Sequence, residues 1–321
     1  DEMMVLASII EKETAVPAER GRLEGGTIMK GDAMTKLLYL ECTSGISGDM
    51  CAAALLDAGA SEEAVRRALE SLPVEGFAVE ISRVKKSGLD VCDFSVVLDA
   101  AHENHDHDMA YLHGHGGASE HGHGHDHDRD HGRAHDHDHA HGAPGGHHHR
   151  GPAEIAQIID GAAMTDGAKA IAHRMFGFVA DAEARAHGVP VGEVHFHEVG
   201  AVDSIADIIA IAVAADDLAP DGVVVSDLPC GYGTVRCQHG LIPVPAPATA
   251  FIAEAAGLTL SPVDVEGELV TPTGAAAAAA LRTEAALPER FSIKAIGMGA
   301  GKRAYDTPGV LRALVVREDT E

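Results

Sequence analysis

The feature that most constrains this chain is a low-complexity segment at residues 101–151, which carries 17 of the 22 histidines among aspartate and glycine. Few apolar residues occur there, so the segment cannot bury enough surface to offset the entropy of ordering and should be disordered without metal. Any hydrophobic core must therefore be assembled from the sequence on both sides. We expect residues 101–151 to interrupt one folded domain as a long loop.

The flanking sequence alternates short apolar runs with alanine-rich amphipathic or apolar stretches, a pattern typical of α/β layered folds. We predict strands at 37–42, 77–84, 91–98, 222–229, 291–301 and 310–318. Helices are predicted up to about residue 58, at 61–72, from 152, at 166–187, at 203–218, from about 247 to 257 and at 275–281. The expected fold is therefore α/β, a layered mixed sheet with flanking helices, interrupted by the disordered histidine-rich loop.

Residues 1–33 do not fit this pattern. The string ASIIEKETAVPAER, at 7–20, resembles the catalytic segment of endolytic murein transglycosylases, and Glu11 matches their acid. A glycosidase site needs a cleft built by a whole domain, and none follows. We interpret the segment as extraneous, either a fusion scar or a misassigned start, with the folded domain at 34–321.

The formal net charge of −26 argues against nucleic acid and anionic membranes as partners, because both need a basic surface. Such a field attracts metal cations instead. No apolar run reaches the roughly 18 residues of a membrane span, and no signal peptide opens the chain. The five cysteines (Cys42, Cys51, Cys92, Cys230 and Cys237) show no CxxC spacing, which favours reduced thiols in a cytoplasmic protein.

The histidine-rich loop places imidazoles two residues apart on flexible backbone, interleaved with carboxylates. Imidazole suits nickel, copper and zinc, and the carboxylates add affinity, although a flexible site imposes no geometry that selects one metal. A chance low-complexity insertion or a tag is the alternative. The candidate ligands in the loop are His105, His107, His121, His123, His125, His127, His135, His137 and His139.

A second histidine pair stands in the string VHFHE ahead of an apolar helix. His195 and His197 fall on one side of an extended connector, a usual arrangement for two ligands of one metal, and Glu198 follows them. We predict that these three residues act in metal transfer or proton transfer.

Asp203 and Asp207 lie four residues apart, on one face of that helix. A carboxylate on such an apolar helix needs a partner, so both are candidate metal ligands. Helix capping is the alternative: Asp203 or Ser204 would be the N-cap, with Asp207 in a capping box.

Two loops that open helices are rich in small residues, which leaves backbone N–H groups free for a phosphate or carboxylate. Neither ends in the Gly-Lys-Ser/Thr of a Walker A loop, and ordinary capped turns explain them equally well. In the second loop we expect Thr273 to be the N-cap. The candidate anion-binding residues are Ser44, Gly45, Ser47, Gly48 and Asp49 in the first loop and Thr271, Thr273 and Gly274 in the second.

The string CGYGTVRCQHG, at 230–240, carries Cys237 and His239 two residues apart, with Arg236 beside them. Cysteine and histidine are ligands for borderline metals, and an arginine can bind phosphate. Glycine turns around a satisfied histidine are the alternative.

Four strings together resemble the nickel insertion protein (LarC) family of nickel-pincer cofactor biosynthesis: LYLECTSGISGDM, HGVPVGEVHFHEVGAVDSIADI, HGLIPVPAPAT and ELVTPTGAA. The resemblance runs from about Met34 to the C-terminus, and many members carry a histidine-rich insertion at this place. It implies a nickel chelatase that inserts Ni(II) into pyridinium-3,5-bisthiocarboxylic acid mononucleotide, giving the cofactor of lactate racemase and related enzymes. It also implies use of CTP with Mn or Mg.

The chain departs from the family pattern in two places. Glu41 stands where the family usually has Asp. The family also continues into a nucleotide-binding domain with an ETNIDDM-like motif, which is absent here, so we expect a separate C-terminal half as a partner and the chain alone to be the metal-handling half. The alternative function is a histidine-rich nickel or zinc storage chaperone, and a homo-oligomer is compatible with either function.

Overall fold

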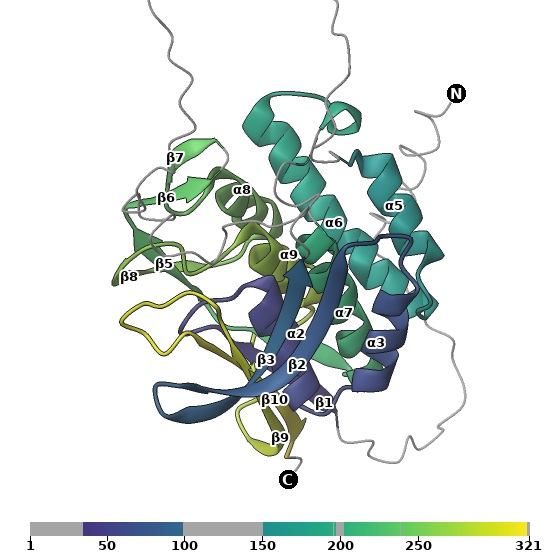
Figure 1. Ribbon diagram of the computed structural model, residues 1–321. Coiled ribbons are helices and arrows are strands. Elements are labelled where there is room, and N and C mark those ends of the chain that lie inside the picture. Colours follow the sequence, from purple (N-terminus) through teal and green to yellow (C-terminus); the bar gives the residue numbers. More distant parts are fainter. Residues whose placement is uncertain (1–34, 99–149, 195, 197–201, 238, 320–321) are drawn as a thin grey trace, which may run out of the picture. The chain divides into compact units, whose positions relative to one another are not determined.

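The computed structural model describes residues 35–98, 150–194, 196, 202–237 and 239–319 (Figure 1). A six-stranded sheet forms its centre. The hairpin predicted around residue 87 lies at one edge of this sheet. In spatial order the strands are β2 (Phe77–Lys86), β3 (Leu89–Leu98), β9 (Phe291–Ala300), β10 (Val310–Glu318), β1 (Lys36–Glu41) and β4 (Gly222–Val225). β1 pairs parallel with β4 and antiparallel with β10, so the sheet is mixed, as the sequence predicts.

Helices pack against this sheet and against one another. They are α2 (Gly48–Asp57), α3 (Glu62–Glu70), α5 (Pro152–Gly161), α6 (Asp166–His187), α7 (Val202–Leu218), α8 (Pro247–Ala256) and α9 (Pro272–Leu281), with a short 3₁₀ turn η1 (Val191–Glu193). α2 packs directly on β9, β3 and β10, and α7 packs on α2, α3, α6 and α9. Because α2, α7 and α9 are apolar around nearly their whole circumference, they lie buried inside the domain.

Local sequence signals begin and end two of these helices where predicted. Ser61 accepts a hydrogen bond from the backbone N–H of Ala64, 3.2 Å, at the start of α3. Thr165 does the same for Ala168, 3.0 Å, at the start of α6. Gly188 ends α6 in the left-handed conformation, which glycine adopts without a steric penalty.

The region after α7 is the part of the fold that the sequence predicts poorly. The single strand expected at 222–229 is two strands, β4 in the main sheet and β5 (Leu228–Tyr232), which pairs with an unpredicted strand, β8 (Leu260–Glu266). The expected glycine turns at 230–240 contain β6 (Thr234–Cys237), paired with β7 (Gly240–Pro243). β5, β6 and β7 are only four or five residues long, too short for apolar alternation to mark a strand, and Pro262 interrupts the start of β8.

β3 ends at Leu98 and α5 begins at Pro152, so the histidine-rich segment connects these two elements. Its residues up to 149, including every loop histidine predicted as a ligand, lie outside the described residues, as do residues 1–34 with Glu11. The disorder of the loop and the extraneous N-terminus therefore stay predictions. All five cysteines are free, as expected for reduced thiols. Among the described helices, none has the length and apolar character needed to cross a membrane.

Candidate functional site

Two loop-to-helix junctions that are far apart in the sequence are joined by backbone hydrogen bonds. The N–H of Ile46 donates to the carbonyl of Leu269, 3.0 Å, and the N–H of Thr271 donates to the carbonyl of Ile46, 3.2 Å. These bonds hold the N-terminal ends of α2 and α9 next to each other. The side chains that follow each junction therefore face a common space.

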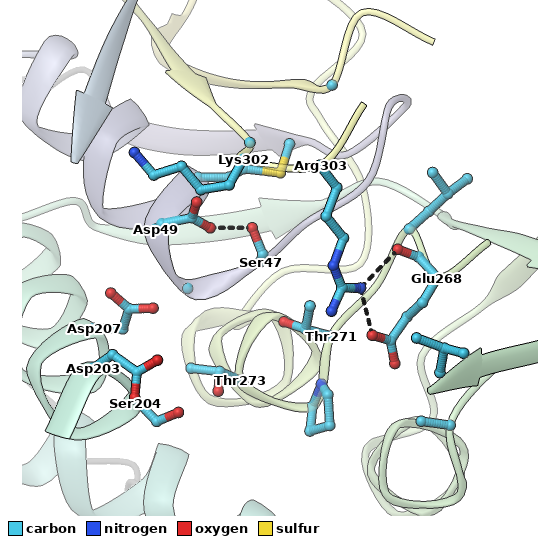
Figure 2. Close-up of a pocket in the computed structure, with 18 of the residues that line it drawn as sticks. Ser47, Asp49, Asp203, Ser204, Asp207, Glu268, Thr271, Thr273, Lys302 and Arg303 are labelled. Carbon is cyan, nitrogen blue, oxygen red and sulfur yellow. Dashed lines mark hydrogen bonds and ion pairs between the residues drawn. The ribbon is translucent and has the colours of Figure 1, made fainter. Parts of the chain in front are cut away.

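That space is a pocket of about 150 Å³, roughly ten times the volume that a single water molecule requires. Its wall combines the starts of α2, α7 and α9 with the β9–β10 loop and the β6–β7 hairpin. Figure 2 shows Asp203 and Asp207 on one side, the Arg303–Glu268 pair on the other, and Thr271 and Thr273 between them. The pocket thus has an acidic end and an end that carries an ion pair.

Three aspartates make the acidic end. Asp49, which is 8% exposed, accepts a short hydrogen bond from the Ser47 hydroxyl through Oδ1, while its Oδ2 is buried with no hydrogen-bond partner among the described residues. Asp203 and Asp207 approach it from α7. A buried carboxylate oxygen without a donor is costly unless a cation completes it. The acidic end is therefore suited to a positively charged ligand.

Asp207 has the most perturbed environment of the three. Burial raises the pKa of its carboxyl well above the usual range, and the neighbouring charges of Asp49 and Asp203 raise it further. Lys302 and a hydrogen bond from the backbone N–H of Asp49 oppose this shift. The carboxylate fits because residue 48 is glycine: a Cβ there would lie 2.2 Å from Asp207 Oδ2.

The opposite end contains Arg303, and the neighbouring Lys302 extends from the same loop toward the acidic end; the sequence analysis identified neither residue. Arg303 donates from Nη1 to Glu268 Oε2, 2.6 Å, and Glu268 is 6% exposed. The Tyr305 hydroxyl donates to the Glu268 carbonyl, 3.1 Å, and Lys302 pairs with Asp93 of β3. The adjacent Lys-Arg pair in an otherwise acidic chain was the only sequence signal available.

The structure divides the predicted anion-binding residues into two groups. Ser44, Ser47, Gly48, Asp49, Thr271 and Thr273 line the pocket. Gly45 and Gly274 instead allow close backbone packing, since a Cβ would lie 2.3 Å from the Leu269 carbonyl oxygen and 2.2 Å from that of Ile46, respectively. At the start of α2, the backbone N–H of Asp49 already donates to Asp207, so that N–H is not available to a phosphate. Anion binding by the two loops stays a prediction.

Two capping predictions are wrong. The N-cap of α9 is Thr271, whose hydroxyl accepts from the Gly274 N–H, 3.1 Å, and not Thr273. Pro272 occupies the first helical position because it has no N–H to satisfy, so the residue before it is the cap. α7 begins at Val202, which places Asp203 inside the first turn and Asp207 beyond it. Asp203 is therefore not the N-cap, and Asp207 is not part of a capping box.

The predicted catalytic residues His195, His197 and Glu198 lie outside the described residues. Their neighbours Val194 and Phe196 are buried, and the Phe196 ring packs edge-on against Phe176 of α6, with ring centroids 5.3 Å apart. The roles predicted for the three residues stay predictions.

The last predicted ligand, His239, belongs to a different neighbourhood from Asp203 and Asp207. Its Nδ1 lies 3.6 Å from Cys237 Sγ, and its ring lies 5.0 Å, centroid to centroid, from that of His187. His187 Nε2 lies 3.4 Å from Glu183 Oε2, and burial raises the pKa of Glu183 while both imidazoles lower it. Within the described ranges, no three His, Cys, Asp or Glu side chains already form a metal-binding group.

Comparison with known proteins shows to which family the chain belongs. The sequence model of the family described as nickel insertion protein matches residues 38–321. The chain belongs to the nickel insertion protein family. It is 45% identical to the pyridinium-3,5-bisthiocarboxylic acid mononucleotide nickel insertion protein of Alkaliphilus metalliredigens, over 89% of this chain and 62% of that one. Identity to the protein of the same name from Geobacillus kaustophilus is 36%, over 88% and 60%.

A putative nickel insertion protein of Geobacter sp. strain M21 is 38% identical over 87% of this chain and 61% of its own length. The chain thus spans about three fifths of the length of the curated relatives that it matches. No solved structure matches.

The four strings that carry the family resemblance all reach this pocket. LYLECTSGISGDM supplies the residues at the start of α2, and the string that ends in DSIADI supplies Asp203 and Asp207. HGLIPVPAPAT contributes Ile242 and Ala246, and ELVTPTGAA contributes Glu268 and the start of α9. Segments from most of the length of a nickel insertion protein domain therefore converge on one cavity.

Proposed function

We propose that this chain binds Ni(II) and inserts it into pyridinium-3,5-bisthiocarboxylic acid mononucleotide, the compound that the names of two relatives specify. The observation that carries the proposal is the convergence of the four family strings on one pocket with an acidic end. An acidic end is suited to a metal cation, and an end with an arginine is suited to the phosphate of a mononucleotide.

The acidic end would receive nickel as a substrate. Carboxylates are hard oxygen ligands and hold nickel less firmly than nitrogen or sulfur ligands, so they can release it to the two thiocarboxylates of the mononucleotide. Asp49 and Asp207 would share the ion with Asp203. Because its pKa is raised, Asp207 would release a proton when the ion binds and could take one up again when the ion leaves for the mononucleotide.

The phosphate would lie toward Arg303, within reach of the Thr271 and Thr273 hydroxyls. A guanidinium presents paired N–H donors that match two phosphate oxygens, and Glu268 keeps that guanidinium oriented.

His195, His197 and Glu198 are proposed to pass nickel into the pocket. Glu198 is five residues before Asp203, so their Cα atoms lie within about 18 Å of each other in any backbone conformation. The imidazole pair would take the ion from the histidine-rich segment, and the adjacent carboxylate would accept a displaced proton.

The curated relatives are longer than this chain, so the full reaction is proposed to require a further part. We propose that a C-terminal half binds CTP with Mn or Mg and activates the mononucleotide, and that the protein works in the cytoplasm. The domain itself would begin near Met34.

Nickel insertion is tested with the full chain, Ni(II), the mononucleotide, CTP and Mg or Mn, with and without the C-terminal half, and the nickel-containing product is measured by mass spectrometry. Replacing His195 and His197 with Ala should abolish product while the number of nickel ions bound barely changes. Deleting residues 102–149 should lower that number and still allow insertion in excess nickel.

The histidine-rich segment favours one competing function, storage or delivery of nickel or zinc without catalysis. In that case the two variants would show the opposite pattern: deletion would remove the function, and the double alanine variant would leave it intact.

A further inference from the structure

A cluster of sulfur, nitrogen and oxygen donors lies where the C-terminal end of α6 meets the β6–β7 hairpin. Cys237 Sγ contacts His239 Nδ1 at 3.6 Å, the His239 ring lies 5.0 Å from the His187 ring, and His187 Nε2 lies 3.4 Å from Glu183 Oε2. The four side chains thus form an unbroken series of contacts between two elements. Nothing in the insertion reaction described above uses His187, Glu183 or Cys237.

The separations have the size expected around one tetrahedral ion. With metal–sulfur bonds of about 2.3 Å and metal–nitrogen bonds of about 2.1 Å, the sulfur and nitrogen ligands lie about 3.6 Å apart. On the same basis two imidazole centroids lie about 5 Å apart, and an imidazole nitrogen lies about 3.4 Å from a carboxylate oxygen. The described donors do not converge on a single point, so side-chain rotations would have to complete the coordination when the ion binds.

The position of the cluster connects it with the pocket. Cys237 is part of the pocket wall, together with Arg236 before it. Of the other cysteines, Cys42, Cys51 and Cys92 are buried, and burial raises the pKa of Cys42 to about 12 and that of Cys92 to about 11, whereas Cys230 is partly exposed. Cys237 is the thiol that stands beside imidazoles and next to the pocket.

We propose that Glu183, His187, Cys237 and His239 form a thiolate–imidazole site for one borderline divalent metal ion, which holds the ion beside the pocket before it moves to the aspartates. The Cys237 thiol releases its proton to solvent when the ion binds. The transfer to the aspartates rests on the proposed insertion function, whereas the binding of the ion does not.

The test uses the full chain and Co(II) alone, because a cobalt–thiolate bond gives a near-ultraviolet charge-transfer absorption that imidazole and carboxylate ligands do not. The histidine-rich segment has no cysteine and is therefore silent in this assay. The wild-type chain should show the absorption, and Ni(II) should displace it. Cys237→Ser should abolish it, and Cys230→Ser, a second partly exposed cysteine, should keep it.

His187→Ala should weaken the cobalt affinity measured by this absorption about tenfold or more. His173→Ala is the matched control, since His173 lies on the same helix and pairs with Asp160 at 2.7 Å, away from the cluster. The proposal is overturned if the wild type shows no absorption in excess cobalt, if the absorption survives in Cys237→Ser, or if the two histidine variants behave alike. Loss of nickel insertion with the absorption intact would count against the insertion function and leave this site standing.

Discussion

Gly274→Ala tests whether the pocket depends on the close approach of α9 to the loop before α2. Gly274 lies in the first turn of α9, where alanine would ordinarily stabilise a helix by about 1 kcal/mol. Here a Cβ would lie 2.2 Å from the carbonyl oxygen of Ile46, 2.6 Å from its carbonyl carbon and 2.9 Å from the Ser47 Cα. All three are backbone atoms, so no side-chain rotation can relieve the overlap.

Overpacking of this kind costs about 1–3 kcal/mol, and backbone contacts on three atoms place it near the upper value. Subtracting the gain in helix propensity leaves a destabilisation of about 2 kcal/mol, which for a domain of this size lowers Tm by about 4–8 °C. Because Ser47, next to Ile46, lines the pocket, the same displacement should also weaken nickel binding at the aspartates.

Gly177→Ala is the matched control, a helical glycine of α6 whose added Cβ would meet nothing within 4 Å. It should stabilise the protein by about 1 kcal/mol and leave nickel binding unchanged. Urea unfolding followed by far-ultraviolet circular dichroism gives both free energies of unfolding. If Gly274→Ala proves as stable as Gly177→Ala, the close approach at Ile46 does not constrain the fold and the reasoning fails.

Three further predictions concern the ends of the pocket and the histidine-rich segment. Arg303→Met should destabilise by about 3 kcal/mol, because it leaves the buried Glu268 carboxylate unpaired, and adding Glu268→Gln should restore part of the loss in a double-mutant cycle of unfolding free energies. Because the pKa of Asp207 is raised, the folded state holds this proton to a higher pH than the unfolded state does. Stability should therefore fall as the pH rises from about 4 through the folded pKa. Asp207→Asn should flatten this part of the pH profile of Tm. Deleting 102–149 should leave Tm within about 2 °C of the wild type while removing most bound nickel, as equilibrium dialysis would measure, and a large fall in Tm would contradict its exclusion from the core.

Most of the regular elements follow from local sequence pattern, and the reasons are physical. β1 and β10 are continuous apolar runs, and α6 carries its own cap residues at both ends, so each is specified within a short window. β5 and β8 form a pair only because distant segments meet in the folded chain. β5 is short and carries proline and glycine, and Pro262 near the start of β8 argues against a strand, so local patterns favour neither strand.

The candidate site, like the fold, was only partly predictable from the sequence. Asp203 and Asp207 were predictable because a carboxylate on an apolar helix needs an explanation wherever the helix lies. Asp49 was predicted as part of an anion cradle and instead belongs to the acidic end, since only the three-dimensional packing of α2 against α7 brings the three aspartates together. Lys302 and Arg303 could not be assigned, because only the folded arrangement of β9 and β10 places their loop at the pocket.

Three carboxylates between otherwise apolar helices oppose folding, which favours a functional role for the acidic end. Asp207 lies beside Gly48, Asp49 and Asp203, where burial and the two neighbouring charges oppose its ionisation. The hydrogen bond from the Asp49 N–H offsets part of this opposition, and by accepting it Asp207 caps α2. A cap alone would need one carboxylate, and it would not explain a second aspartate or the buried Asp49 Oδ2. Asp207→Asn separates these roles, because the amide oxygen can still accept from the Asp49 N–H but carries no charge to attract a cation. A variant that keeps its stability and loses nickel transfer would assign the three carboxylates to the metal rather than to the fold.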